Sequence, residues 1–385
     1  MPRLHELPPE CVLLVADQIT QPRDINALAR TSQHMHATLN RYMYRRAVQY
    51  PEAPEMLQQC VEKANIEGIR HWIAAGGAVE GPNDRPSVLS AVKKRHAVLS
   101  SLYQLRYIQR IKSQPLKPGV HSRNEAIRLG LEAKAQTYLE IAELLIDNGA
   151  PLVPPVGWCW TLLADYLSPL HLAAHTWDKD MILALLKKGA DVHCTVEGGL
   201  TVLHAAVNGS LAISPYYRGD IGPIVECLVE HGADVNARLT KSGITPLHDA
   251  VCFLEPTAAA ALLVHGARPN IADVTGNTPL HYVKYAPWGK PIDPLVKLLL
   301  GHGADMEAKT NGGWTPLATA VVFAGDEAPA RCLIQNGADV DFRDMDGRDP
   351  VQLAHRYHGP DFARKIRDLL EEAKRGTRPC KKRRI

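Results

Sequence analysis

Apolar residues in the second half of this chain recur at helical spacing, and a glycine follows each set. Four apolar side chains lie eight, seven, four and three residues before Gly189, Gly232, Gly266 and Gly303. Residues at this spacing share one face of a helix. Glycine is well suited to end such a helix, because it adopts the left-handed backbone conformation at little cost. The pattern therefore predicts a series of short amphipathic helices, each closed by its glycine.

A second signal precedes each of these helices. The sequence Thr-Pro-Leu-His is intact at residues 245–248 and 278–281, and near-copies begin at Ser168, Thr201, Thr315 and Asp349. Ser, Thr and Asp cap helices, and proline is favoured at the first helical position. The starts are separated by 33, 44, 33, 37 and 34 residues. A period near 33 predicts a solenoid of repeated helix pairs.

These units resemble ankyrin repeats, which implies an all-α solenoid with hairpin-like finger turns between units. We expect five clear repeats over residues 168–348 and capping helices over 349–373. Weaker units ending at Gly76 and Gly149 occupy residues 51–151, with a long helical insertion near 93–135. In two units, extra residues are expected between the paired helices, near 208–223 and 284–294.

The first fifty residues have a different pattern, which predicts three short helices at about 8–18, 22–31 and 33–47. They contain Leu-Pro-Pro-Glu at 7–10, Asp-Ile-Asn-Ala-Leu at 24–28 and Thr-Ser-Gln-His-Met-His at 31–36. This segment resembles an F-box, and the layout is similar to fungal F-box/ankyrin-repeat proteins. Cys11 is a departure, because the family usually has Leu or Ile there.

The F-box resemblance implies docking onto a Skp-type adaptor and, through it, a cullin ubiquitin ligase. The matching positions are Leu7, Pro8, Leu13, Ile25, Leu28, Thr31, Ser32 and Met35. So small a domain with exposed apolar helices needs a partner to cover them. The alternative is that these helices cap the N-terminal end of the solenoid.

Charge and composition narrow the class of protein. The net charge is +3, but the segment 374–385, expected to be a disordered tail, holds seven basic residues and no acid. The rest of the chain is therefore mildly acidic, which argues against a nucleic-acid-binding solenoid. The tail is a nuclear import signal, a weak contact for an anionic surface, or simply solvated.

Location follows from the cysteines and from hydropathy. The eight cysteines show no paired spacing, and no apolar stretch reaches 18 residues. Free thiols are typical of a reducing compartment. We expect a cytoplasmic or nuclear protein, or both, without a membrane partner.

Candidate chemistry is sparse. His171 and His175 stand four residues apart, a spacing that can bind a metal. However, His171, His204, His248 and His281 all occupy the same repeat position. We therefore expect each to hydrogen-bond a turn of its own or a neighbouring unit. No catalytic, cofactor-binding or metal-binding residue is assigned, and we expect no enzyme.

Ankyrin arrays bind partners through finger tips and first helices, and this is carried over from the family. The finger residues with non-repeating character are Arg238, Lys241, Asp273, Lys309, Asn311, Trp314, Arg343, Asp344 and Met345. Trp314 is either a binding hot spot or a packing residue over the neighbouring finger.

Two hypotheses of function follow. In the first, the chain is the substrate-recognition subunit of a Skp–cullin–F-box ubiquitin ligase, with the ankyrin repeats binding a target protein. In the second, it is an ankyrin scaffold or regulator with no role in ubiquitination.

Overall fold

The computed structural model describes residues 53–79, 87–111, 118–152, 168–212, 220–286 and 291–376. The regular secondary structure of the described residues is helical apart from one hairpin, whose two strands have two residues each. This agrees with the expected all-α solenoid. It forms two compact units, the first reaching residue 173 and including 180–190, the second holding 174–179 and the chain from 191 onward. The predicted helices of residues 1–50 lie outside the described residues.

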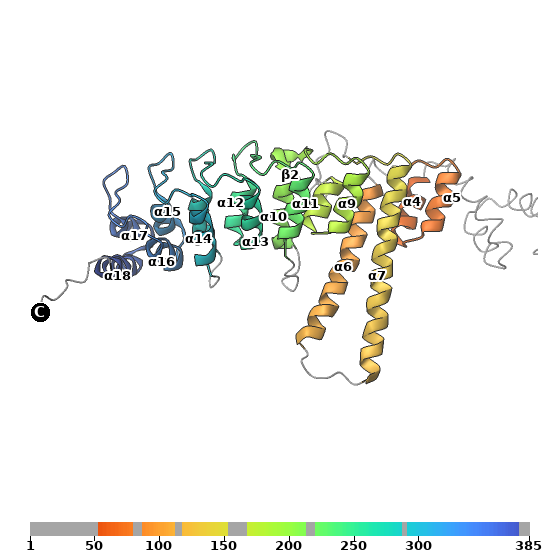
Figure 1. Ribbon diagram of the computed structural model, residues 1–385, viewed down its shortest axis with the longest axis horizontal. Coiled ribbons are helices and arrows are strands. Elements are labelled where there is room, and N and C mark those ends of the chain that lie inside the picture. Colours follow the sequence, from red (N-terminus) through yellow and green to blue (C-terminus); the bar gives the residue numbers. More distant parts are fainter. Residues whose placement is uncertain are drawn as a thin grey trace, which may run out of the picture. The chain divides into compact units, whose positions relative to one another are not determined.

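The first unit contains a long helical hairpin. Its helices are α4 (Ala53–Glu62), α5 (Ile66–Ala74), α6 (Ser87–Ile111), α7 (Pro118–Asp147) and most of α8 (Pro169–His175) and α9 (Lys179–Lys187). Helices α6 and α7 have 25 and 30 residues. They run side by side and extend past α4 and α5 (Figure 1).

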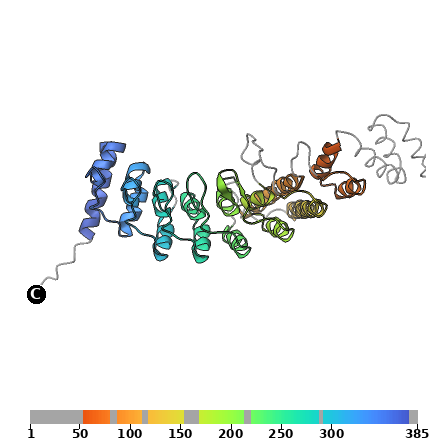
Figure 2. The same ribbon diagram turned by 90° about the horizontal axis from the view of Figure 1, so that it is seen from above.

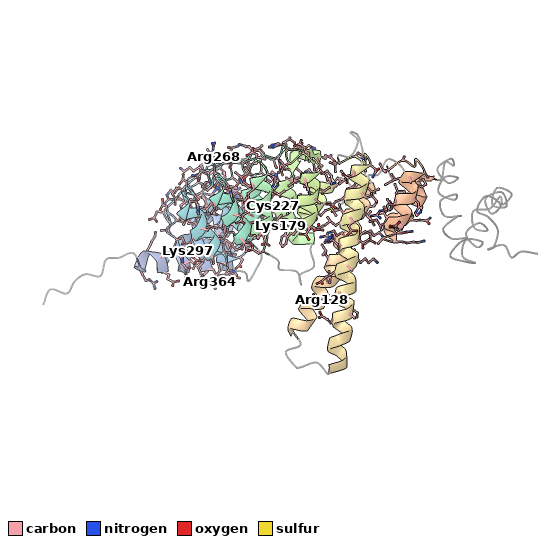
Figure 3. All side chains as sticks on the ribbon, turned by 45° about the vertical axis from the view of Figure 1, so that its right-hand side comes forward. Arg128, Lys179, Cys227, Arg268, Lys297 and Arg364 are labelled. Atoms are coloured by element: carbon pink, nitrogen blue, oxygen red, sulfur yellow. The ribbon has the colours of Figure 1, made fainter. Side chains whose placement is uncertain are left out.

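The hairpin answers a question that the sequence left open. The pattern predicted a long helical insertion near 93–135 but did not define the helices in it. In the structure, α6 continues without a break from Ser87, and α7 runs to the turn at Gly149. The inserted residues lengthen both helices of one pair. Figure 3 shows Arg128 on α7, where it pairs with Glu125 and with Glu132 at 2.8 Å.

Three long-range contacts anchor the hairpin within its unit. The hydroxyl of Tyr138 donates to the Glu62 carbonyl at 2.9 Å. The buried Arg95 guanidinium donates to the Ala135 carbonyl at 2.6 Å and pairs with Asp180 at 3.0 Å. These contacts join α4, α6, α7 and α9.

The second unit is a regular stack of helix pairs. Its elements are β1 (Thr195–Val196), η4 (Glu197–Gly199), β2 (Leu200–Thr201), α10 (Val202–Ala212), α11 (Gly222–Glu230), α12 (Pro246–Cys252), α13 (Pro256–Val264), η5 (Pro279–Tyr285), α14 (Asp293–Gly301), α15 (Pro316–Phe323), α16 (Glu327–Gln335), α17 (Pro350–His358) and α18 (Pro360–Gly376). Figure 2 shows the pairs side by side in chain order. The fingers all emerge at one end of the helices (Figure 1).

The start and stop signals act as the sequence predicts. Thr315 caps α15 by accepting from the Ala318 N–H, and Asp349 forms a capping box with Gln352. The glycines that close the units have positive φ, 90° at Gly266 for example, a conformation that side chains rarely adopt. The extra residues of two units fall between their paired helices, as expected.

Two details differ from the expected pattern. The first helix after Thr278 is a 3₁₀ helix, η5. The final helix α18 runs to Gly376, so Lys374 and Arg375, which the sequence assigned to the tail, are helical. The face of α18 formed by Phe362, Ile366, Leu369 and Leu370 is buried, which supports its role as a cap.

Candidate functional site

The repeat histidines fix the fingers that form the candidate binding surface. The Thr245 N–H donates to His248 Nδ1 at 3.1 Å, so Nε2 carries the proton and donates to the Asn277 carbonyl at 3.0 Å. His281 repeats this arrangement with Thr278 and with the Trp314 carbonyl at 3.1 Å. Each histidine thus ties its own helix start to the next finger, as the sequence predicted.

Burial keeps these histidines neutral. It lowers the pKa of His248 and of His281 to about 4. A neutral imidazole supplies one acceptor and one donor, which matches the two partners of each ring. The described residues hold no group of three or more His, Cys, Asp or Glu side chains arranged to bind a metal ion.

Two acidic finger candidates are held by their own fingers. Asp273 accepts hydrogen bonds from Thr275, Asn277 and the Tyr282 hydroxyl, the last at 2.9 Å. Burial alone would raise the pKa of Asp273, but these hydrogen bonds bring it below its ordinary value. Asp344 is buried and accepts from the Arg348 N–H at 2.7 Å. Both carboxylates shape the fingers that carry them.

The other polar candidates are exposed at the finger tips. Arg238 donates to the Ala272 carbonyl at 2.8 Å and Asn311 to the Val274 carbonyl at 3.0 Å, so both also bridge to the preceding or following finger. Lys241, Lys309 and Arg343 are exposed. Their role in binding stays a prediction.

Trp314 packs between two units. Its ring centroid lies 5.4 Å from that of Phe323 on α15 and 6.5 Å from that of Tyr357 on α17. The side chain is half-buried. Met345, which is 77% exposed, belongs to the following finger and lies beside Gly313. Trp314 therefore contributes both packing and accessible surface.

Sequence reasoning missed the aromatic side chains of the first helices. Tyr285, Phe323 and Tyr357 expose 54%, 51% and 45% of their surface. They lie at the ends of η5, α15 and α17, seven or eight residues after the start of each unit. An aromatic residue at this fixed distance from the start of each unit was the signal in the sequence that could have identified them.

An unpartnered carboxylate lies on α12. Asp249 is 8% exposed, and its Oδ2 has no hydrogen-bond partner among the described residues. Burial raises the pKa of Asp249 to about 7. The corresponding position of the preceding unit holds Ala205.

The predicted adaptor-binding residues, from Leu7 to Met35, lie outside the described part of the chain. Their role stays a prediction. Among the helices that the structure describes, none combines the length and apolar character that crossing a bilayer requires.

A protein-family model for the ankyrin repeat matches residues 165–196, 198–238, 275–311 and 312–345. The unit at 245–274 lies between matched segments, and the structure gives it the same helix pair, α12 and α13. The match does not include residues 1–50.

Several known proteins are similar to this array. The mouse B-cell lymphoma 3 protein homolog is 28% identical over 252 residues, which cover 64% of this chain and 50% of that protein. Human neurogenic locus notch homolog protein 4 is 39% identical over 102 residues, 26% of this chain and 5% of that protein. Phosphocholine transferase AnkX of Legionella pneumophila is 29% identical over 133 residues, 34% of this chain and 14% of that protein.

The chain spans half or less of the length of these three relatives. One of them is named as an enzyme, so the shared repeats do not decide whether a protein that carries them is catalytic. What they share with this chain is the repeat itself. The helix pairs, the histidine bonds between units and the family match together show that this chain contains an array of ankyrin repeats.

Proposed function

We propose that this chain recognises a target protein through its ankyrin array and delivers it to a cullin ubiquitin ligase through an F-box-like module at residues 1–50. In this account the chemistry belongs to other subunits. The chain contributes proximity, which raises the effective concentration of target lysines near the ligase.

The observation that carries the binding half of this proposal is the fixed row of fingers. Hydrogen bonds from His204, His248 and His281 to the next finger hold successive units in register. The exposed aromatic rings of Tyr285, Phe323 and Tyr357 line the last three units of the array. A pre-organised surface loses little entropy on binding, and exposed apolar rings are typical of interaction sites.

The ligase half of the proposal rests on the sequence. Leu-Pro-Pro-Glu and the Asp-Ile-x-x-Leu and Thr-Ser-x-x-Met-His segments match an F-box along residues 7–36. The order of an adaptor-binding module followed by a protein-binding array is also the order that a ligase receptor needs.

Proximity labelling of the full-length chain in proteasome-inhibited cells tests both halves. The wild type should label a Skp-type adaptor and at least one protein that accumulates only under inhibition. Ile25→Asp should lose the adaptor and keep the target, whereas Trp314→Ala should keep the adaptor and weaken target labelling. Equal adaptor labelling by wild type and Ile25→Asp would contradict the ligase half.

The second candidate is an ankyrin scaffold without a role in ubiquitination. It is favoured by the family match, which covers segments of residues 165–345 and not the first fifty. It predicts that a chain lacking residues 1–46 labels the same targets and leaves their abundance unchanged. Stabilisation of those targets by the deletion would rule it out.

A further inference from the structure

Four aromatic side chains form a connected series across the last three units of the array. We call Tyr285, Phe323, Trp314 and Tyr357 the aromatic series. Trp314 contacts both Phe323 and Tyr357, and Lys284 joins Tyr285 to Phe323. The Lys284 Nζ lies 5.1 Å from the ring centroid of Tyr285 and 4.8 Å from that of Phe323.

The elements that carry this series pack directly against each other. Helix α15 contacts both η5 and α17. Three of the four rings expose about half of their surface, and Met345 beside Trp314 is more exposed still. Adjacent rings from successive units can receive apolar side chains of an extended segment more readily than isolated ones.

The two cations of this surface differ in their exposure to solvent. Lys284 is 8% exposed, and its ammonium makes one long hydrogen bond, 3.3 Å to Asn277 Oδ1. Arg356 is exposed, lies 6.0 Å from the Tyr357 ring centroid and makes no ion pair with any described residue. Arg356 therefore retains donors for a further partner. The Lys284 ammonium is covered by the rings of Tyr282, Tyr285 and Phe323 and adds positive charge beneath them.

Apart from the buried Asp249 on the adjoining helix α12, the carboxylates nearby are engaged by the chain itself. Asp273 and Asp349 accept hydrogen bonds from their own segments. Asp344 and Asp346 pair with Arg348 at 3.3 and 2.6 Å. The charges that this surface offers to a partner are thus positive, although the chain without its basic tail is net acidic.

We propose that the aromatic series binds a linear acidic segment of the target protein, whose apolar side chains pack on the rings and whose carboxylates pair with Arg356. This inference rests on the proposed function, because it assigns the chemistry of the target that the array recognises. The proposed ligand is acidic, although the net negative charge of the chain without its basic tail would favour a basic ligand.

Fluorescence anisotropy with defined peptides tests the proposal on the full-length protein. The probe is a fluorescein-labelled peptide of three Asp-Phe-Glu-Leu repeats. In one matched peptide lysine replaces every acid, and in another serine replaces every apolar residue. The acidic apolar peptide should bind at least tenfold more tightly than either, and its affinity should fall as salt is raised.

Variants locate the site. Arg356→Glu and Phe323→Ser should each weaken the acidic peptide about tenfold or more, because a charge partner or a ring contact is lost. Arg268→Glu and Val264→Ser are the matched controls, since both residues are exposed and lie away from the series on the α13 segment; Figure 3 labels Arg268. The controls should bind as the wild type does. Tyr357→Ser gives an independent second test if Phe323→Ser folds poorly by circular dichroism.

Three results would overturn the inference: no saturable binding of the acidic peptide, equal or tighter binding of the lysine peptide, or equal losses in Arg356→Glu and Arg268→Glu. The proposed function is judged separately by proximity labelling. A target labelled through the array while the peptide fails would leave that function standing and remove only the acidic docking site.

Discussion

The hairpin α6–α7 and the units that begin at Thr245 and Thr278 are held in place by different kinds of contact. In the regular units, the same histidine bond recurs 33 residues apart and links each unit to the next. In the hairpin, single contacts bridge distant segments, such as Tyr138 to Glu62 and Arg95 to Asp180. A repeated contact gives a fixed row of fingers, whereas single anchors allow one helix pair to grow far beyond its neighbours.

The largest expected effect comes from removing one of the recurring bonds. His281→Ala loses the cap at Thr278 and the bond to the Trp314 carbonyl, and it leaves a cavity at a side chain that is 1% exposed. We expect a loss of about 3 kcal/mol in the free energy of unfolding. Urea denaturation followed by circular dichroism measures it. A loss below about 1 kcal/mol would show that the recurring bond is dispensable.

The buried His281 should also make the stability of the fold depend on pH. The folded pKa of His281 is about 4, below the ordinary value of 6.5, so the unfolded chain binds the proton first as pH falls. Stability is therefore fully present above pH 6.5 and is lost as pH falls towards 4, by about 1.4 kcal/mol per pH unit for one histidine. His281→Ala should show a shallower decline over this window than the wild type.

The next largest loss of stability should be confined to the helices that Arg95 joins. Arg95→Met removes the donor to the Ala135 carbonyl and the pair with Asp180, at a cost of about 2 kcal/mol. Hydrogen exchange followed by mass spectrometry should show faster exchange in α6, α7 and α9. Protection of α12 to α16 should stay the same. Equal losses in both regions would contradict the distinction between single and recurring anchors.

A smaller effect, a gain in stability rather than a loss, is expected from replacing Asp249. Its folded pKa of about 7 lies above the ordinary value of 3.8, so stability is lost as pH rises from 3.8 through 7. Asp249→Ala, which installs the residue found at Ala205, should raise the free energy of unfolding by about 1–2 kcal/mol at pH 8. The gain should disappear near pH 3.5. A gain of equal size at both pH values would contradict burial of the charged carboxylate as its cause.

The smallest expected change in stability comes from adding the recurring histidine bond to a unit that lacks it. The unit at Thr315 has Ala318 where the units at Thr245 and Thr278 have histidine, and Arg348 precedes the next unit start as Trp314 and Asn277 do. Ala318→His should donate to the Arg348 carbonyl and stabilise by about 1 kcal/mol. Thermal unfolding would detect it. Ala318→Phe serves as the control of similar size without the hydrogen bonds.

The same contrast explains what the sequence could predict. The capping residues, the histidine bonds and the closing glycines are local or strictly periodic, so the array and its inter-unit bonds were predicted correctly. The anchors of the hairpin, Arg95 and Tyr138, bond to carbonyls 40 and 76 residues away, and no periodicity marks such partners.

The candidate surface was predicted only in part. Trp314 and Met345 stand out because they break the finger pattern, and both are accessible in the structure. Asp273 and Asp344 also break it, but their carboxylates serve the finger itself. Whether an acid faces a partner or its own turn depends on the backbone geometry of each finger, which residue identity alone does not determine.

Binding of the full-length chain to a purified Skp-type adaptor tests the central claim most directly. Isothermal titration calorimetry of the wild type should show a saturable one-to-one complex, which Ile25→Asp abolishes. Val274→Asp, at an exposed site of a finger in the array, should leave it unchanged. No measurable binding by the wild type, or equal binding by Ile25→Asp, would contradict the account of this chain as a link between a target and a ligase.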